Sequence, residues 1–248
     1  MITLSLIGIG TGNPDHLTAE AVKALNAADL ILIPRKGAAK SDLAEVRELI
    51  LSRVLNRPVP VAAYDVPTRA DQDDYLGAVN DWHGAIAKVW AETIAANLSG
   101  GVKVALMVWG DPSLYDSTLR IAGRLPDVAI KVIPGITSLQ VLTAAHAIPL
   151  NTLAAPVTIT TGRRLRDHGW PEGATTVAVM LDKGGAFTGL DPQAVTIWWG
   201  AYLGMPEEHL IVGALAEVSA HILATRARLR AEHGWIMDIY LLRRGHDS

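Results

Sequence analysis

Residues 7–21 read IGIGTGNPDHLTAEA, and this stretch decides the fold. An apolar run over residues 3–9 ends among three glycines at alternate positions, and helical spacing begins at Thr18. A short apolar run closed by glycine predicts a buried strand, and the glycines allow a tight turn whose backbone can approach a ligand. The stretch therefore predicts a strand–loop–helix unit, which is typical of α/β proteins with a buried parallel sheet.

The same alternation of apolar runs and helical spacing continues toward the C-terminus. In the first half, strands are expected at 3–9, 30–33, 59–63, 103–108 and 129–133, and helices at 18–28, 41–55, 71–98 and 114–125. In the second half, strands are expected at 157–161, 176–181, 195–199, 208–215 and 236–243, and helices at 137–147, 185–190 and 221–233. Because fewer helices separate the later strands, the second sheet is expected to be mixed. The sequence thus predicts two α/β/α domains, residues 1–127 with a mainly parallel sheet and residues 128–248 with a mixed one.

Composition excludes several classes of function. The chain of 248 residues has a net charge of −3 and a pI near 6.2, so no basic excess marks a nucleic-acid or lipid-surface binder. No apolar stretch reaches the length of a membrane span, and the apolar N-terminus lacks the basic flank of a secretory leader. The chain has no cysteine, which excludes thiolate chemistry and fits a reducing cytoplasm, where we expect it. The eight histidines show no paired ligand spacing, so no metal site is expected.

The glycine loop taken alone leaves three interpretations open. A dinucleotide fingerprint needs a third glycine where this chain has Asn13, and an acid at the end of the second strand, where the chain reads Pro34-Arg35-Lys36. An NADP-dependent oxidoreductase with Arg35 at the 2′-phosphate is therefore one alternative. A purely structural turn is the second, and a cradle for another cofactor is the third.

Four ordered motifs distinguish these interpretations. Besides the glycine loop, the chain reads VWGDPSLYDS at 108–117, VIPGITSLQVLTAAHAIPLN at 132–151 and TTVAVML at 175–181. Together these resemble the tetrapyrrole (corrin and porphyrin) methylase family, whose first motif is written roughly VGxGPGDPxLLTxxA. The chain departs from that motif at Thr11, where the family has proline, and at Asn13, where aspartate is common. A dinucleotide fold has no use for the Gly-Asp-Pro or Pro-Gly-Ile-Thr-Ser loops.

The resemblance implies a cofactor and its contacts. Members of the family bind S-adenosylmethionine in a cleft between two domains, release S-adenosylhomocysteine and form homodimers. Carried over position by position, the cofactor-binding residues expected here are Gly10, Thr11, Trp109, Gly110, Asp111, Leu114, Thr137, Ser138, Met180, Gly213 and Ala214. For Asp111, the plain alternative is a cap on the following helix. A tetrapyrrole carrier without enzymatic activity is the alternative that would bind no S-adenosylmethionine.

Two further stretches resemble a deacylating branch of the family. They are DLILIPRKG at 29–37 and RAEHGWIMDIYLLRRG at 230–245. This resemblance implies methylation of the cobalamin precursor precorrin-5 at ring carbon 1, with release of a two-carbon acyl fragment as acetate. Methylation at a different ring carbon, as in other branches, is the alternative.

The implied reaction asks for two sets of side chains. Carboxylates of a tetrapyrrole are suited to guanidinium and ammonium groups, and the candidates after strand ends are Arg35, Lys36, Arg163 and Arg164. Loss of the acyl group requires a base for the attacking water and a donor to the acyl oxygen. The candidate bases are Asp15, His16, Tyr115 and Asp116, and the residues alone do not choose among them.

Overall fold

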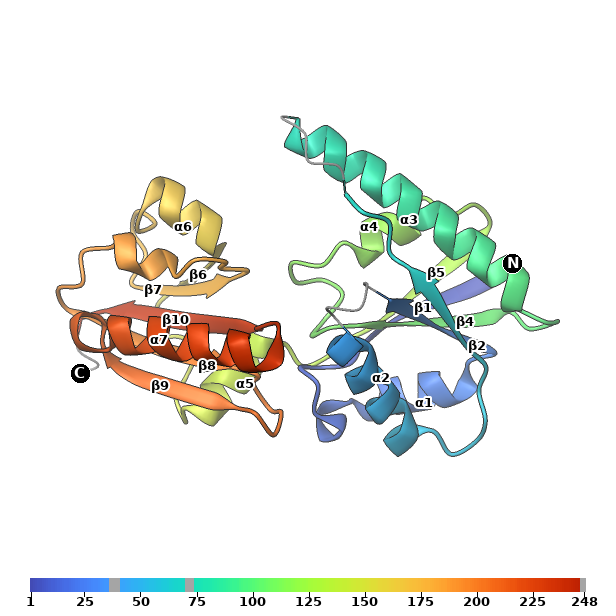
Figure 1. Cartoon of the computed structure of the whole chain (residues 1–248), viewed down its shortest axis with the longest axis horizontal. Coiled ribbons are helices and arrows are strands. Elements are labelled where there is room, and N and C mark those ends of the chain that lie inside the picture. The colour runs from blue at the N-terminus through green and yellow to red at the C-terminus, as the bar shows by residue number, and fades with distance from the viewer. Residues whose placement is uncertain (36–40, 70–73, 246–248) are drawn as a thin grey trace. The chain divides into compact units, whose positions relative to one another are not determined.

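The computed structural model describes residues 1–35, 41–69 and 74–245. The chain forms two compact units, Met1–Thr137 and Ser138–Ser248, both of the α/β class (Figure 1). Among the described residues, no helix has the length and apolar character needed to cross a bilayer.

The first unit contains a five-stranded sheet in the order β3-β2-β4-β1-β5, and all its strands run parallel. The strands are β1 (Ile2–Gly8), β2 (Leu30–Arg35), β3 (Val61–Asp65), β4 (Lys103–Val108) and β5 (Val128–Ile133). The helices are η1 (Pro14–His16), α1 (Ala19–Ala27), α2 (Ser41–Val54), α3 (Tyr75–Asn97) and α4 (Thr118–Ala122). Because parallel strands all end at one edge, the loops after them gather at the carboxyl edge of this sheet.

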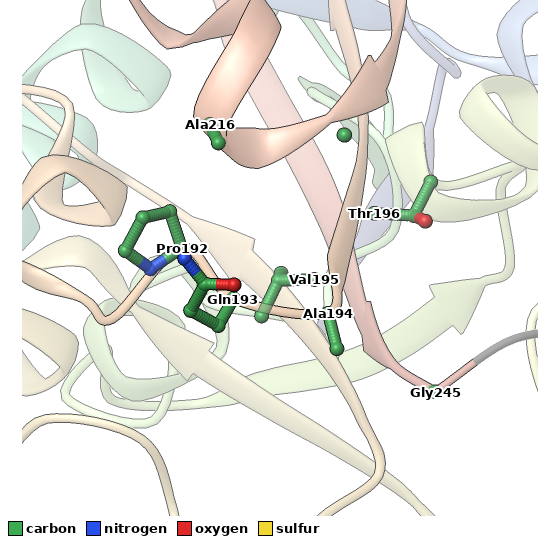
Figure 2. Close-up of a pocket in the computed structure, with 8 residues that line it drawn as sticks. Pro192, Gln193, Ala194, Val195, Thr196, Ala216 and Gly245 are labelled. Carbon is green, nitrogen blue, oxygen red and sulfur yellow. The ribbon is translucent and has the colours of Figure 1, made fainter.

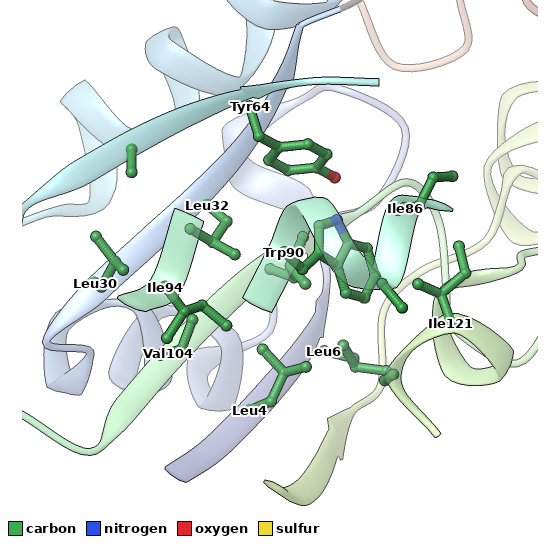
Figure 3. Close-up of a cluster of buried hydrophobic side chains, with 14 of the residues drawn as sticks. Leu4, Leu6, Leu30, Leu32, Tyr64, Ile86, Trp90, Ile94, Val104 and Ile121 are labelled. Atoms are coloured by element: carbon green, nitrogen blue, oxygen red, sulfur yellow. The ribbon is translucent and has the colours of Figure 1, made fainter. Parts of the chain in front are cut away.

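Helices cover both faces of the first sheet, and this explains the continuous apolar strand sequences. Leu25 of α1 and Ile50 of α2 pack on one face, whereas Trp90 of α3 and Ile121 of α4 pack on the other. Figure 3 shows Trp90 beside Tyr64 of β3, with ring centroids 6.2 Å apart in an edge-to-face arrangement. Side chains packed on both faces hold the strands, and with them the carboxyl edge of the sheet, in place.

The second unit contains a mixed sheet in the order β6-β7-β10-β8-β9, in which only β6 and β7 pair in parallel. Its strands are β6 (Val157–Thr161), β7 (Thr176–Met180), β8 (Val195–Ala201), β9 (His209–Ala214) and β10 (Asp238–Arg244). Its helices are α5 (Ser138–Ala145), α6 (Gly162–His168), η3 (Ala186–Gly189) and α7 (Leu215–His233). The expected fold class is confirmed: an all-parallel sheet precedes a mixed one.

Several details differ from the sequence-based expectations. The domain boundary expected after residue 127 would separate β5 from the sheet in which it pairs with β1, and the two units divide after Thr137 instead. Helix α6 was not expected, although Thr161 caps it by accepting a hydrogen bond from the Arg164 amide at 3.4 Å. The helix expected at 114–125 begins only at Thr118, because Asp116 Oδ1 accepts the Thr118 amide at 2.6 Å and turns the chain there.

Candidate cofactor and substrate site

Two glycine loops are joined at the carboxyl edge of the first sheet. The amide of Gly110 donates to the carbonyl of Gly10 at 2.7 Å, and the Gly10 amide donates back to Gly110 at 3.3 Å. Both residues have a positive φ, +71° at Gly10 and +62° at Gly110, which favours glycine. The loops after β1 and β4, two neighbouring strands, therefore form one connected surface.

The loop after β5 is packed against the same pair of glycines. A Cβ placed on Gly135 would lie 2.2 Å from the carbonyl oxygen of Gly110 and 2.8 Å from the backbone of Gly8. No side chain fits at that separation, so glycine is required by close approach of three backbones. The glycines at positions 8, 110 and 135 leave main chain, without side chains, at the edge where a ligand would be cradled.

Asp111 connects the loops after β4 and β5. Its carboxylate accepts the Ser113 amide at 2.8 Å, the Ser113 hydroxyl, and the Gly135 amide at 2.8 Å. Burial opposes ionisation, but the hydrogen bonds from Ser113 and Gly135 outweigh it, so the pKa of Asp111 lies below its ordinary value. Asp111 is not the cap of the next helix, which begins at Thr118. The residue instead holds two loops together, and Leu114 closes the turn by donating its amide to the Asp111 carbonyl at 3.2 Å.

Trp109 is held by an arginine that the sequence analysis missed. The guanidinium carbon of Arg47 lies 4.8 Å from the centre of the Trp109 ring, within the range of a cation–π contact. Arg47 is 6% exposed, and burial lowers its pKa to about 10. The signal was present in the sequence, because Arg47 shares one face of α2 with the buried residues Ile50 and Leu51.

The four candidate bases differ in their surroundings. Asp15 is exposed, and Tyr115 is 44% exposed with φ +50°. The carboxylate of Asp116 accepts a hydrogen bond from the Thr118 amide. His16 Nδ1 is buried without a hydrogen-bond partner among the described residues.

The candidate substrate cations occupy two places. Arg35 is exposed at the carboxyl end of β2, opposite Asp65 of β3, at the same edge as the glycine loops. Lys36 lies outside the described residues. Arg163 and Arg164 are exposed in the first turn of α6, at the carboxyl end of β6 in the second unit, and not in a loop as expected.

The two expected adenosyl contacts of the second unit are not brought together. Met180 is the last residue of β7. Gly213 of β9 pairs with Ile197 of β8, which pairs with Leu242 of β10, and Leu242 pairs with Val177 of β7. Two strands lie between the two sites, which gives three strand spacings, and three residues separate them along the strand, so the distance is roughly 15 Å or more. Gly213 and Ala214 therefore lie well apart from Met180 in the sheet, and Met180 alone is kept among the contacts proposed below.

Ala214 instead borders a separate hollow of about 230 Å³ (Figure 2). Its lining is Pro192, Gln193, Ala194, Val195, Thr196, Ala214, Ala216 and Gly245. No charged side chain lines it, and its volume is below the roughly 300–1,000 Å³ of small-molecule pockets.

A buried polar network fixes the loop that follows Met180. The Asp182 carboxylate accepts the Ala186 amide at 2.6 Å and the Tyr240 hydroxyl at 2.7 Å. Arg226 pairs with Asp238 at 2.8 Å and donates to the Asp182 carbonyl at 2.7 Å. Burial, together with the Asp182 carboxylate, raises the pKa of Tyr240, so this hydroxyl stays protonated as a donor. Within the described ranges, no group of three His, Asp or Glu side chains is arranged to hold a metal ion.

Comparison with known proteins gives consistent results. The model of the Tetrapyrrole (Corrin/Porphyrin) Methylases matches residues 3–219. A precorrin-6A synthase [deacetylating] of Sinorhizobium sp. is 48% identical over 254 residues, which cover 100% of this chain and 97% of the relative. The crystal structure of a cobalamin synthesis related protein (CobF) from Corynebacterium diphtheriae superposes with a TM-score of 0.83 at 38% identity, covering 99% of this chain and 100% of that one.

A more distant structure shares the fold. It is the uroporphyrin-III C-methyltransferase of Thermus thermophilus in complex with S-adenosylhomocysteine, with a TM-score of 0.57, 17% identity, and coverage of 97% of this chain and 92% of that one. The joined glycine loops of the first sheet are consistent with the family model and with the full-length relative. They are also consistent with the two-unit architecture that the solved structures share. This chain therefore belongs to the tetrapyrrole (corrin/porphyrin) methylase family.

Proposed function

We propose that this protein is the S-adenosylmethionine-dependent C-methyltransferase that converts precorrin-5 into precorrin-6A in cobalamin biosynthesis. It methylates ring carbon 1 and releases the acyl group as acetate. The observation that carries the proposal is the 48% identity to a deacetylating precorrin-6A synthase over the whole chain. A tetrapyrrole methylase acting at another ring carbon has no comparable full-length support, because the precorrin-2 C(20)-methyltransferase of Sinorhizobium sp. matches over only 58% of this chain.

The carboxyl edge of the first sheet fits the methyl donor. Gly8 and Gly135 pack against each other and against the Gly110 carbonyl, so the main chains of three loops meet at this edge. When bound, S-adenosylmethionine supplies an activated methyl group, so the protein has to align the partners and exclude water. The residues proposed to hold it are Gly10, Thr11, Trp109, Gly110, Asp111, Leu114, Thr137, Ser138 and Met180. Asp111 acts by fixing the loops, since its oxygens are already bonded to Ser113 and Gly135.

Calorimetric titration with S-adenosylhomocysteine tests the cofactor assignment. We expect one molecule to bind per chain, and saturating NADPH to leave the affinity unchanged. Competition by NADPH would instead support an oxidoreductase that uses Arg35 at the 2′-phosphate. A protein that binds the tetrapyrrole but no S-adenosylhomocysteine would be a carrier.

Arg35 is proposed to bind a substrate carboxylate. Replacing it with alanine should weaken tetrapyrrole binding about tenfold, since a hydrogen bond to a charged group contributes about 1.5–3 kcal/mol. The affinity for S-adenosylhomocysteine should not change. Arg53→Ala is the matched control, because this exposed arginine lies in the last turn of α2, away from the carboxyl edge. A change below threefold in substrate affinity for Arg35→Ala would refute the assignment, which can be measured by absorbance titration.

The exposed arginines Arg163 and Arg164 are proposed as further contacts to substrate carboxylates, and so is Lys36. We further propose that the protein acts as a homodimer in the cytoplasm. The dimer is proposed from the family, and the compartment from the absence of cysteine. Light scattering of the purified protein tests the dimer, and cell fractionation tests the compartment.

A further inference from the structure

Two side chains in the loop after β1 have buried polar atoms that lack a partner. Thr11 Oγ1 and His16 Nδ1 make no hydrogen bond within the described part of the chain, and Thr11 is only 9% exposed. Protein interiors rarely leave such groups unpaired, because a buried donor or acceptor without a partner costs free energy. The two atoms therefore call for a partner that the described residues do not supply.

Hydrogen bonds within the loop and packing on Gly10 hold His16 in place. The Asp15 amide donates to Asn13 Oδ1 at 2.9 Å, and the His16 amide donates to the Asn13 carbonyl at 3.0 Å. A Cβ on Gly10 would lie 3.1 Å from the Cβ of His16, so the histidine packs directly on the Gly10 backbone. Since Gly10 is bonded to Gly110, His16 lies at the edge proposed to hold the methyl donor.

The other candidate bases are less suited to proton transfer. The Asp116 carboxylate is engaged with the Thr118 amide, and Asp15 is exposed to water. Tyr115 is also exposed. An imidazole can accept a proton at one ring nitrogen and release one from the other.

Resting on the proposed function, we propose that His16 is the general base of the deacylation step and that the Thr11 hydroxyl donates a hydrogen bond to the acyl oxygen. Water attacks the acyl carbonyl carbon, a carbon–oxygen bond forms, and the proton of the water passes to the His16 imidazole. The bond between ring carbon 1 and the acyl carbon then breaks. Acetic acid leaves, and the electron pair stays on the ring carbon, which forms a bond to the methyl carbon as the methyl–sulfur bond of S-adenosylmethionine breaks. His16 then releases its proton to water. No oxidant or reductant is needed.

Two of the departures of this chain from its family motif fall at these positions, and another is at Asn13. The motif has proline at position 11 and leucine at position 16, and neither residue can donate or accept a proton through its side chain. Methyl transfer alone asks for neither group, whereas acyl hydrolysis asks for a base and a hydrogen-bond donor. Thr11 and His16 therefore supply the two groups that acyl hydrolysis requires and methyl transfer does not.

The experiment measures acetate release and methyl transfer by the purified enzyme with precorrin-5 and S-adenosylmethionine. His16→Ala should lower the rate of acetate release at saturating substrate by at least 100-fold, which is within the range for a general base. Its affinity for S-adenosylhomocysteine should stay within twofold of wild type. Added imidazole should restore the rate of His16→Ala at least tenfold. Thr11→Val, which keeps the side-chain shape, should lower the rate about 100-fold, as expected for loss of an oxyanion donor.

His168→Ala, at an exposed histidine in the last turn of α6, is the matched control and should behave as wild type with and without imidazole. If His16→Ala lowers the melting temperature, His16→Gln provides the same comparison with a longer polar side chain. A His16 variant that keeps more than a third of the rate, or that does not respond to imidazole, overturns the assignment of His16 alone. Wild-type enzyme that transfers the methyl group without releasing acetate overturns the proposed function, and the role of His16 with it.

Discussion

Replacing Asp111 with alanine is expected to weaken S-adenosylhomocysteine binding by roughly 30-fold or more, because the loops after β4 and β5 lose their connection. The carboxylate accepts hydrogen bonds from Ser113 and from the Gly135 amide. Each hydrogen bond to a charged group contributes about 1.5–3 kcal/mol, and the Gly135 amide would be left unpaired. We expect a smaller effect on the free energy of unfolding, since Asp111 is not in a core. Calorimetry and thermal melting on the same variant separate the two effects.

Ser113→Ala is the control for Asp111, because it removes only the hydroxyl contact and should change the affinity by threefold or less. Equal losses for both variants would show that the link to Gly135 is unimportant. The pH dependence has a definite sign. Because the folded pKa of Asp111 is lowered from its ordinary 3.8, its contribution to stability is complete above that value. The difference in unfolding free energy between wild type and Asp111→Ala should therefore shrink only as the pH falls through the lowered folded pKa.

Replacing Gly135 with alanine is expected to lower the free energy of unfolding by about 3 kcal/mol or more, at the upper end of overpacking effects. The added Cβ would lie 2.2 Å from the Gly110 carbonyl oxygen, and backbone atoms cannot rotate away as a side chain can. Relief requires the loop after β5 to shift from the loop after β4, so cofactor affinity should fall as well.

Gly84→Ala is the matched control for Gly135→Ala. Gly84 lies inside α3, and its nearest neighbour to an added Cβ is the flexible end of Arg124 at 3.5 Å. Alanine there should leave stability unchanged or raise it by up to about 1 kcal/mol, because alanine favours helix. Chemical denaturation measures both variants. A Gly135→Ala protein as stable as wild type would mean that the three backbones do not approach as closely as described.

The sequence predicted the first sheet well because parallel strands buried on both faces are continuous apolar runs. The prediction was less accurate for β5, the strand at the edge of that sheet. β5 exposes residues such as Ile130 and Lys131, and an edge strand carries no sign of which sheet it joins. That is why the domain boundary was placed too early.

The site was predictable where backbone geometry decides and not where topology decides. The resemblance to the family motifs pointed to Gly10, Gly110 and Asp111, and the structure joins their loops. The same resemblance placed Gly213 beside Met180. The insertion of β10 between β7 and β8 and the reversal at β9 put them far apart, and no local pattern encodes a strand order. Arg47 was not predicted, because its contact with the Trp109 ring joins residues that are far apart in the sequence.

One enzyme is expected to replace an acyl group by a methyl group on the same ring carbon. The most direct test supplies purified protein with precorrin-5 and S-adenosylmethionine carrying a carbon-13-labelled methyl group, and quantifies acetate and labelled tetrapyrrole by nuclear magnetic resonance. We predict one acetate per methyl transferred, with the label on ring carbon 1. Label on a different ring carbon, with no acetate released, would contradict the account.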